Sequence, residues 1–270
     1  MVHILDKNKN LTIHKQNLII RGKFGEFTVD TMRCLNAIYY GLQKELKKDN
    51  VNANNGHITF KMSSLRKYMN LEKNNDYVDI IRKSLRQLQE PFDIPNYTDV
   101  DGKVWKWYCM SLLIKSKTPK ENEITVNIQV DEEMISLIKN KSEWTELEFN
   151  NVQHFSSKYA MRTYEYAKSY ANMKKTPPLD LDNLNSLFGT KYTYLSDVEK
   201  ILKRAIKDIN KTDIYIDYDK DKKLKTITLK ITKNENKEKQ KIAIKIKKSL
   251  YKEMNGDEDI MNDILEKINK

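Results

Sequence analysis

The stretch from Ser196 to Ile231 constrains the fold more strongly than any other part of the chain. Apolar residues three or four positions apart predict an amphipathic helix that Ser196 caps and that runs to about Asn210. Two short runs of alternating apolar and polar residues follow directly, with the charged turn Asp219–Lys223 between them. The pattern therefore predicts a helix that leads straight into a β-hairpin.

Two further helices are predicted just before this stretch. Ser156 and Ser157 precede a helix whose face carries Ala160, Tyr164, Ala167 and Ala171, Pro177 and Pro178 break the chain, and Asp180 or Asp182 can cap a short helix ending at Gly189. Two close helices followed by a hairpin are typical of a helix-turn-helix with a wing.

A similar order of elements precedes this unit. We expect a helix from Thr28, a strand over His57–Met62, a helix capped by Ser63, a helix from Asp76 to Gln89 that Pro91 ends, and strands over Val104–Lys115 and Ile124–Val130. The fold class predicted from this order is α+β, with tandem winged-helix domains. The repetition is one of architecture, because no residue-level repeat relates the two halves.

The element order also suggests how the chain divides. Residues 1–145 would form a first winged-helix domain with a basic-polar N-terminal arm, and residues 146–233 a second one. Residues 234–270 form a highly charged tail that contains a candidate short helix around Ile260–Ile268.

The chain carries a formal net charge of +11, which favours a polyanionic partner such as DNA, RNA or an acidic membrane surface. Lys and Asn are abundant throughout, so a Lys-rich proteome bias is the alternative explanation, and the charge alone decides little. Cys34 and Cys109 are the two cysteines, and neither belongs to a C-x-x-C pair. With no signal-peptide core and no apolar run near the ~18 residues of a membrane span, we expect a cytoplasmic protein without membrane contact.

Three segments resemble plasmid replication initiators of the RepB/RepE type, which bind repeated sites called iterons at plasmid origins. The most specific is FSSKYAMRTYEYAKSY, Phe155 to Tyr170, similar to the opening helix of that family's second winged helix. LKRAIKDINKTDI, Leu202 to Ile214, is similar to the segment running from its recognition helix into the wing. NLII, Asn17 to Ile20, is a weaker match.

The resemblance implies several properties. Monomers of such proteins bind direct repeats of double-stranded origin DNA and help to open an AT-rich segment. Dimers, paired through the first domain, often repress their own gene. The proteins recruit the host initiator, helicase and primase, and they carry no catalytic site and no cofactor.

The predicted helix from Ser196 to Asn210 has one apolar face and one basic face, as a helix in the major groove requires. Arg204 is the best candidate to read a base, because its planar guanidinium can make two hydrogen bonds to guanine. The lysines are candidates for phosphate contacts, which position the protein without reading sequence. The candidates in this region are Lys200, Lys203, Arg204, Lys207 and Lys211. A lysine face that is merely solvated is the alternative.

Other basic residues fall at comparable positions. In the first unit the helix from Asp76 to Gln89 offers Arg82, Lys83 and Arg86. In the second, Lys158 and Arg162 could hold phosphate at the start of their helix, but Arg162 could equally pair with Glu165 three residues along. Trp105, Trp107 and Tyr108 could stack on single-stranded bases, although alternation within a strand favours core packing.

Catalytic motifs are missing from the sequence. No His-x-His pair accompanies the tyrosines as a rolling-circle mechanism would require, and no P-loop occurs. Asp131, Glu132 and Glu133 are interpreted as charges at a helix N-terminus. Two rival functions stay open: a winged-helix transcriptional repressor without a role in replication, and a metal-dependent enzyme that nicks origin DNA.

Overall fold

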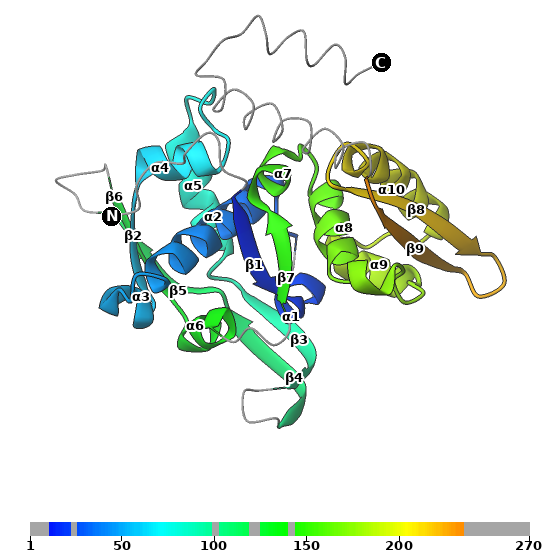
Figure 1. Cartoon of the computed structure of the whole chain (residues 1–270), viewed down its shortest axis with the longest axis horizontal. Helices are drawn as coiled ribbons and strands as arrows, with labels where there is room; N and C mark the ends of the chain where they lie inside the picture. The colour runs from blue at the N-terminus through cyan, green and yellow to red at the C-terminus, as the bar shows by residue number, and fades with distance from the viewer. Residues whose placement is uncertain (1–10, 23–25, 99–102, 119–124, 140–143, 235–270) are drawn as a thin grey trace, which may run out of the picture.

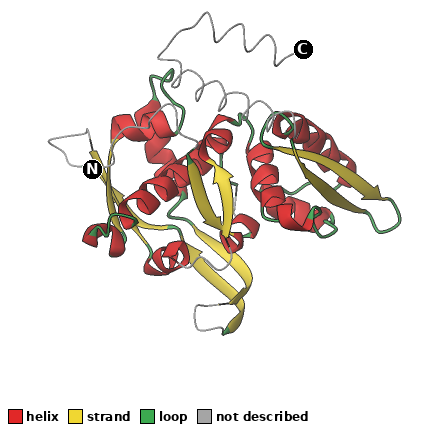
Figure 2. Cartoon of the chain, viewed as in Figure 1, coloured by secondary structure: helices red, strands yellow, loops and turns green. Residues whose placement is uncertain are grey.

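The computed structural model describes residues 11–22, 26–98, 103–118, 125–139 and 144–234. Two groups of helices lie side by side along the long axis of the molecule, the first with several small sheets and the second with one hairpin (Figures 1 and 2). The predicted α+β class and the two helix-turn-helix units with hairpins are confirmed. The predicted tail lies outside the described residues.

The first unit is built around the long helix α2 (Val29–Leu46), which Thr28 caps by accepting a hydrogen bond from the Thr31 N–H. A short helix α3 (Val51–Asn54) leads into β2 (His57–Lys61), and the helix-turn-helix follows as α4 (Met62–Tyr68) and α5 (Tyr77–Gln87). Ser63 lies inside α4 rather than capping it, because the helix begins one residue earlier, at Met62.

The wing of the first unit differs from the prediction. The expected strand Val104–Lys115 is divided at Leu112, a buried residue, into β4 (Val104–Ser111) and β5 (Leu113–Lys117). Only β5 joins β6 (Thr125–Val130) and β2, in the order β2-β6-β5. Strand β4 pairs instead with an unpredicted strand, β3 (Pro91–Thr98), and this hairpin projects from the lower side of the molecule in Figure 1.

The described part of the predicted N-terminal arm, residues 11–22, is part of the fold. Strand β1 (Thr12–Gln16) pairs antiparallel with β7 (Trp144–Glu148), and the short helix α1 (Asn17–Arg21) follows. Ile13, Ile19 and Ile20 are fully buried. The sequence did not predict strand β1, because its partner strand lies more than 120 residues away and nothing local indicates the pairing. The position 145/146, proposed as a domain boundary, falls inside β7.

Helix α6 (Glu132–Lys139) precedes β7, and α7 (Phe149–His154) follows it. Glu132 and Glu133 stand in the first turn of α6, as expected of acidic residues at a helix N-terminus. Asp131 also accepts a hydrogen bond from the Glu133 N–H at 2.9 Å.

The second unit follows the prediction closely. Ser157 caps α8 (Lys158–Lys168), a 3-10 turn η1 (Ala171–Met173) follows, and Asp180 caps α9 (Leu181–Phe188), which ends at Gly189 with a φ of +59°. Helix α10 (Leu195–Ile209) leads into β8 (Ile214–Asp221) and β9 (Thr226–Lys233). Ser196 is not the cap, because α10 begins at Leu195.

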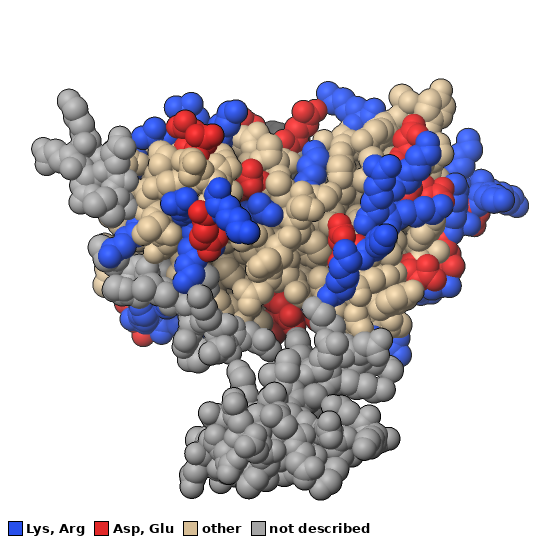
Figure 3. Space-filling model, turned by 90° about the horizontal axis from the view of Figure 1, so that it is seen from above, with Lys and Arg blue, Asp and Glu red and all other residues tan. Residues whose placement is uncertain are grey.

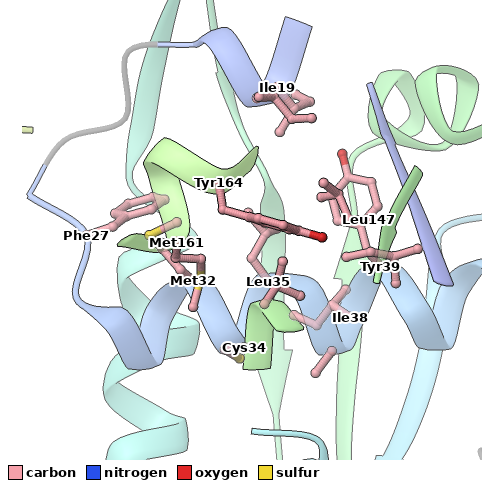
Figure 4. Close-up of a cluster of buried hydrophobic side chains, with 14 of the residues drawn as sticks. Ile19, Phe27, Met32, Cys34, Leu35, Ile38, Tyr39, Leu147, Met161 and Tyr164 are labelled. Carbon is pink, nitrogen blue, oxygen red and sulfur yellow. The ribbon is translucent and has the colours of Figure 1, made fainter. Parts of the chain in front are cut away.

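One continuous core joins the two units. Figure 4 shows Met161 and Tyr164 of α8 among Met32, Leu35 and Ile38 of α2, with Ile19 of α1 and Leu147 of β7 nearby. All of these side chains are buried. Since apolar burial drives folding, α8 contributes to the core of both units.

A charged cluster is buried at the same place. The Lys15 ammonium contacts both Glu165 carboxylate oxygens, at 2.9 and 3.0 Å, and Asn36 Oδ1 at 3.0 Å. Lys15 and Glu165 are 1% and 0% exposed. Burial lowers the pKa of Lys15, against the opposing effect of Glu165. The cluster therefore ties β1 and α2 to α8 through a charge pair that water does not reach.

Candidate nucleic-acid interface

Helix α10 presents opposite faces to the core and to solvent. Val198, Leu202, Ala205 and Ile209 are buried against the rest of the second unit. At about 100° per residue, Lys200, Lys203, Arg204, Lys207 and Lys211 fall within an arc of about 100° on the other side. All five are exposed. The sequence therefore places a basic face on the helix that follows the turn of the helix-turn-helix, and from Lys200 to Lys211 this face runs for about 16 Å.

The five cations on this face are not equivalent. Lys200 pairs with Asp197 at 3.1 Å, Lys203 with Glu199 at 3.2 Å and Lys211 with Asp208 at 2.9 Å. Arg204 and Lys207 make no ion pair with any residue that the structure describes. Exposed pairs of this kind contribute little, but a paired ammonium offers less net charge to an external anion. Arg204 and Lys207 are consequently the most available cations on the helix.

Glu199 connects α10 to the wing. Its carboxylate accepts hydrogen bonds from the Tyr218 hydroxyl at 2.9 Å and from the Lys220 ammonium at 2.5 Å, both on β8. These bonds, Lys220 first, lower the pKa of Glu199 to about 2. Glu199 is 16% exposed and stays ionised over the ordinary pH range. It therefore fixes the position of the hairpin relative to the basic face.

The counterpart in the first unit is α5. Ile81, Ser84 and Leu85 are its buried residues, and Arg82, Lys83 and Arg86 are exposed on the other side. Arg82 lies 3.6 Å from Asp79. Figure 3, which looks down on the upper edge of Figure 1, shows Lys and Arg side chains in two groups, over the α4–α5 region and over α10. Basic side chains of both units thus lie on this face of the molecule.

Arg162 is not a phosphate contact, which corrects one of the two alternatives left open for it. Its side chain is 3% exposed and donates to the carbonyl oxygens of Leu187 and Gly22, both at 3.0 Å. It also lies 3.8 Å from Glu165, so the alternative of structural pairing is confirmed. Desolvation lowers the pKa of Arg162 to about 10. A guanidinium in the core cannot reach DNA, and Arg162 instead joins α8 to α9 and α1.

Lys158 and Lys211 differ in exposure, because Lys158 is half-buried and Lys211 is exposed. Lys158 is half-buried at the start of α8, 5.5 Å from the centre of the Tyr159 ring, and burial lowers its pKa. Lys211 follows the end of α10 and lines a groove of about 420 Å³ together with His154 and Ser156. Both stay candidates for backbone contacts.

Two residues that sequence reasoning missed lie at this surface. Tyr194 is 68% exposed at the N-cap position of α10, directly before the basic face. The sequence feature that could have identified Tyr194 is its position just before the predicted basic helix. Glu199 had a local signal only in its spacing of four residues from Lys203. Its pairing with Lys220 depends on the tertiary fold.

The aromatic residues of β4 are not core residues as a group. Trp105 is 40% exposed, with the Lys103 ammonium 4.0 Å from its ring centre, so core packing was wrong for this side chain. Tyr108 is half-buried and donates a hydrogen bond to Glu133. The side chain of Trp107 lies outside the description. Within the described ranges, no three His, Cys, Asp or Glu side chains gather as a metal ion would require.

The fold and these basic faces define a tandem winged-helix protein of the DNA-binding class. The family model "Initiator Replication protein, WH1" matches residues 12–168. The match covers more than half of the chain, which therefore belongs to the family of initiator replication proteins.

One solved structure supports the fold. Domains 2 and 3 of RctB, in a selenomethionine form, superimpose with a TM-score of 0.50 at 11% identity, over 76% of this chain and 82% of that one. A second structure of RctB domains 2–3 gives 0.43 at 11% identity, over 75% and 79%. No curated protein sequence matches the chain significantly. In the part of the chain that is described, no helix has the length and apolarity of a membrane span.

Proposed function

We propose that this initiator binds direct repeats in double-stranded plasmid origin DNA through α10 and α5. The observation that carries the proposal is the basic face of α10, which lies opposite the buried stripe and ends at the wing. Arg204 reads a guanine, and Lys200, Lys203, Lys207 and Lys211 bind phosphates. Arg82, Lys83 and Arg86 do the same for a second segment of the site, and Lys158 supplies a further backbone contact.

The remaining steps of initiation belong to the same proposal. The bound protein opens the neighbouring AT-rich segment and recruits the host initiator, helicase and primase in the cytoplasm. As a dimer, paired through residues of the first unit, it represses its own gene. These steps need surfaces for DNA and for proteins, and we assign them no cofactor and no catalytic residue. Residues 1–145 and 146–233 remain the proposed domains, although they share a core.

The test is fluorescence anisotropy of the full chain on repeats from its adjacent noncoding DNA, with a scrambled duplex of equal composition as control. A preference of about a thousandfold at near-physiological salt supports sequence-specific recognition. Equal binding to both duplexes contradicts it. The logarithm of the binding constant should fall with the logarithm of salt concentration, with a slope of roughly −0.9 for each phosphate contact.

A replication assay separates the initiator from its rivals. A plasmid carrying only the repeats and this chain's gene should replicate in a suitable host and should fail when Arg204 and Lys207 are both changed to Ala. Repression without replication would indicate a plain winged-helix repressor. Magnesium-dependent nicking of supercoiled origin DNA would indicate the enzyme instead.

A further inference from the structure

The turn of the β8–β9 hairpin carries an apolar side chain that the core does not use. Leu224 is 67% exposed, and Figure 1 shows this turn extending beyond α9 and α10 at one end of the molecule. Lys222, Lys223 and Lys225 surround it, and all three are exposed. An isolated exposed leucine is ordinary on a protein surface. A functional role for Leu224 therefore has to be argued from the residues around it.

The turn holds Leu224 in a defined position. Asp221 and Thr226 form the last pair of the β-ladder. The Asp221 carboxylate then accepts hydrogen bonds from the backbone N–H groups of Lys223 and Leu224, at 2.8 and 2.9 Å. Lys225 completes the turn in the left-handed region, with a φ of +53°. An aspartate that bonds its own turn in this way fixes the loop locally, so the leucine is displayed at the tip rather than folded back.

Some charged side chains around the turn are paired within the protein, and others are left to interact with an external partner. Lys220 is held by Glu199, and Lys230 pairs with Asp219 at 2.7 Å. The carboxylate of Asp221 is engaged by the backbone. Lys222, Lys223 and Lys225 have no ion pair among the described residues, which leaves three cations at the tip to meet an external polyanion.

We propose that Leu224 enters the minor groove of duplex DNA, with Lys222, Lys223 and Lys225 on the phosphates at its edges. Apolar side chains that enter this groove partly unstack a base step and kink the duplex. The groove is about 6 Å wide, so it admits the Leu224 side chain and not the two strands behind it. Pyrimidine–purine steps such as TA deform most easily. This site rests on the proposed function, because Glu199 bonds the wing to α10 and a duplex held on the basic face of α10 therefore lies beside the wing.

The test measures bending apart from binding. A duplex with the repeat carries end labels for energy transfer, and 2-aminopurine replaces adenine at each TA step beside the repeat. The wild-type chain should shorten the end-to-end distance and raise the 2-aminopurine signal at one step. Leu224→Ser should lose both effects and bind severalfold more weakly, with unchanged base preference, whereas Leu224→Met should keep them. Val51→Ser, at a position 70% exposed on α3, is the matched control.

Two outcomes overturn different claims. If Leu224→Ser bends and unstacks the duplex as the wild type does, the wedge is absent, whatever the affinity for the repeat. If the wild type bends the repeat and a scrambled TA-containing duplex equally, and Leu224→Ser bends neither, the wedge stands and sequence-specific origin binding fails.

Discussion

At the scale of single residues, Arg204 differs from the lysines around it because a planar guanidinium can make a paired hydrogen bond to one base. We expect Arg204→Ala to weaken binding to the preferred repeat by about 1–3 kcal/mol and to relax the preference at one base position. Anisotropy on a panel of single-base variants measures both effects. An equal loss on every duplex, scrambled DNA included, would identify Arg204 as a phosphate contact instead.

The lysines of α10 should differ among themselves. Lys207 has no ion pair within the described chain, whereas Lys203 lies 3.2 Å from Glu199. Lys207→Ala should therefore make the slope of the logarithm of the binding constant against the logarithm of salt concentration shallower, by nearly the contribution of one phosphate contact. Lys203→Ala should change this slope less. Neither change should alter base preference. The assignment fails if Lys203→Ala has the larger effect on the slope, or if either variant shifts the preferred sequence.

Local patterns found some residues of the site and could not find others. The face of α10 follows from spacing alone, because its buried and basic residues repeat with the helix period. Arg162 has an equally good local pattern, three residues from Glu165, yet it lies in the core. The deciding contacts are with Gly22 and Leu187, which are distant in sequence, so spacing could only leave the two roles open.

At the scale of elements, Glu199 joins the recognition helix to the wing, and its contribution to stability should depend on pH. The pKa of its carboxyl is about 2 in the folded chain, against an ordinary 4.5. A depressed carboxyl pKa stabilises the fold above the unfolded value and loses this effect as pH falls toward the folded value. Glu199→Gln should therefore cost about 1–2 kcal/mol, with allowance for solvent screening, near pH 6.

Urea denaturation at a series of pH values measures this dependence. The difference between wild type and Glu199→Gln should shrink between about pH 4.5 and pH 2 and nearly vanish at the lower end. Asp197→Asn, on the same helix with an exposed partner, Lys200, is the control and should show a small difference throughout. A Glu199→Gln difference that is independent of pH would mean that the carboxylate charge is not what holds the wing.

Helix α2 and strand β2 meet at Gly41, where a larger residue has no room. A Cβ atom there would lie 2.6 Å from Phe60 Cε1 and 3.1 Å from Ile58 Cδ1. Alanine is the better helix former by about 1 kcal/mol, yet we expect Gly41→Ala to destabilise the chain by about 1–3 kcal/mol through overpacking. Thermal unfolding measures this. The double variant Gly41→Ala/Phe60→Leu should recover part of the loss, and a more stable Gly41→Ala chain would contradict the close contact.

The elements themselves were predictable where one local signal dominated. Thr28, Ser157 and Asp180 cap their helices as their side chains suggest, and Gly189 ends α9. The β3–β4 hairpin escaped prediction because Pro91 and Pro95 weaken the strand signal of β3. The long run from Val104 to Lys115 also gives no local sign that it breaks at Leu112 and exchanges partners.

At the scale of the whole molecule, the two units should unfold together. Their shared core includes Met161 and Tyr164 between α1 and α2, and sequence order alone placed a boundary inside β7. Lys15 had the signal of a solvated arm residue, since its partner Glu165 lies 150 positions away. The pairing of β1 with β7 helps to bring Lys15 to Glu165. The burial of Lys15 therefore depends on the tertiary structure and could not be predicted from composition.

The buried cluster of Lys15, Arg162 and Glu165 contains two cations and one anion. Removing the anion should therefore lower the free energy of unfolding more than removing one cation. Glu165→Gln leaves two buried cations without a countercharge and should cost about 3–5 kcal/mol. Lys15→Met should cost less, because Glu165 keeps Arg162 at 3.8 Å and the Asn36 amide at 3.3 Å. The double variant Lys15→Met/Glu165→Gln should be more stable than Glu165→Gln alone, since it removes one uncompensated charge. Urea denaturation should show one transition for all four chains. Additive losses would show that the two side chains act independently, and a second transition would show that the units unfold separately and that the cluster does not join them.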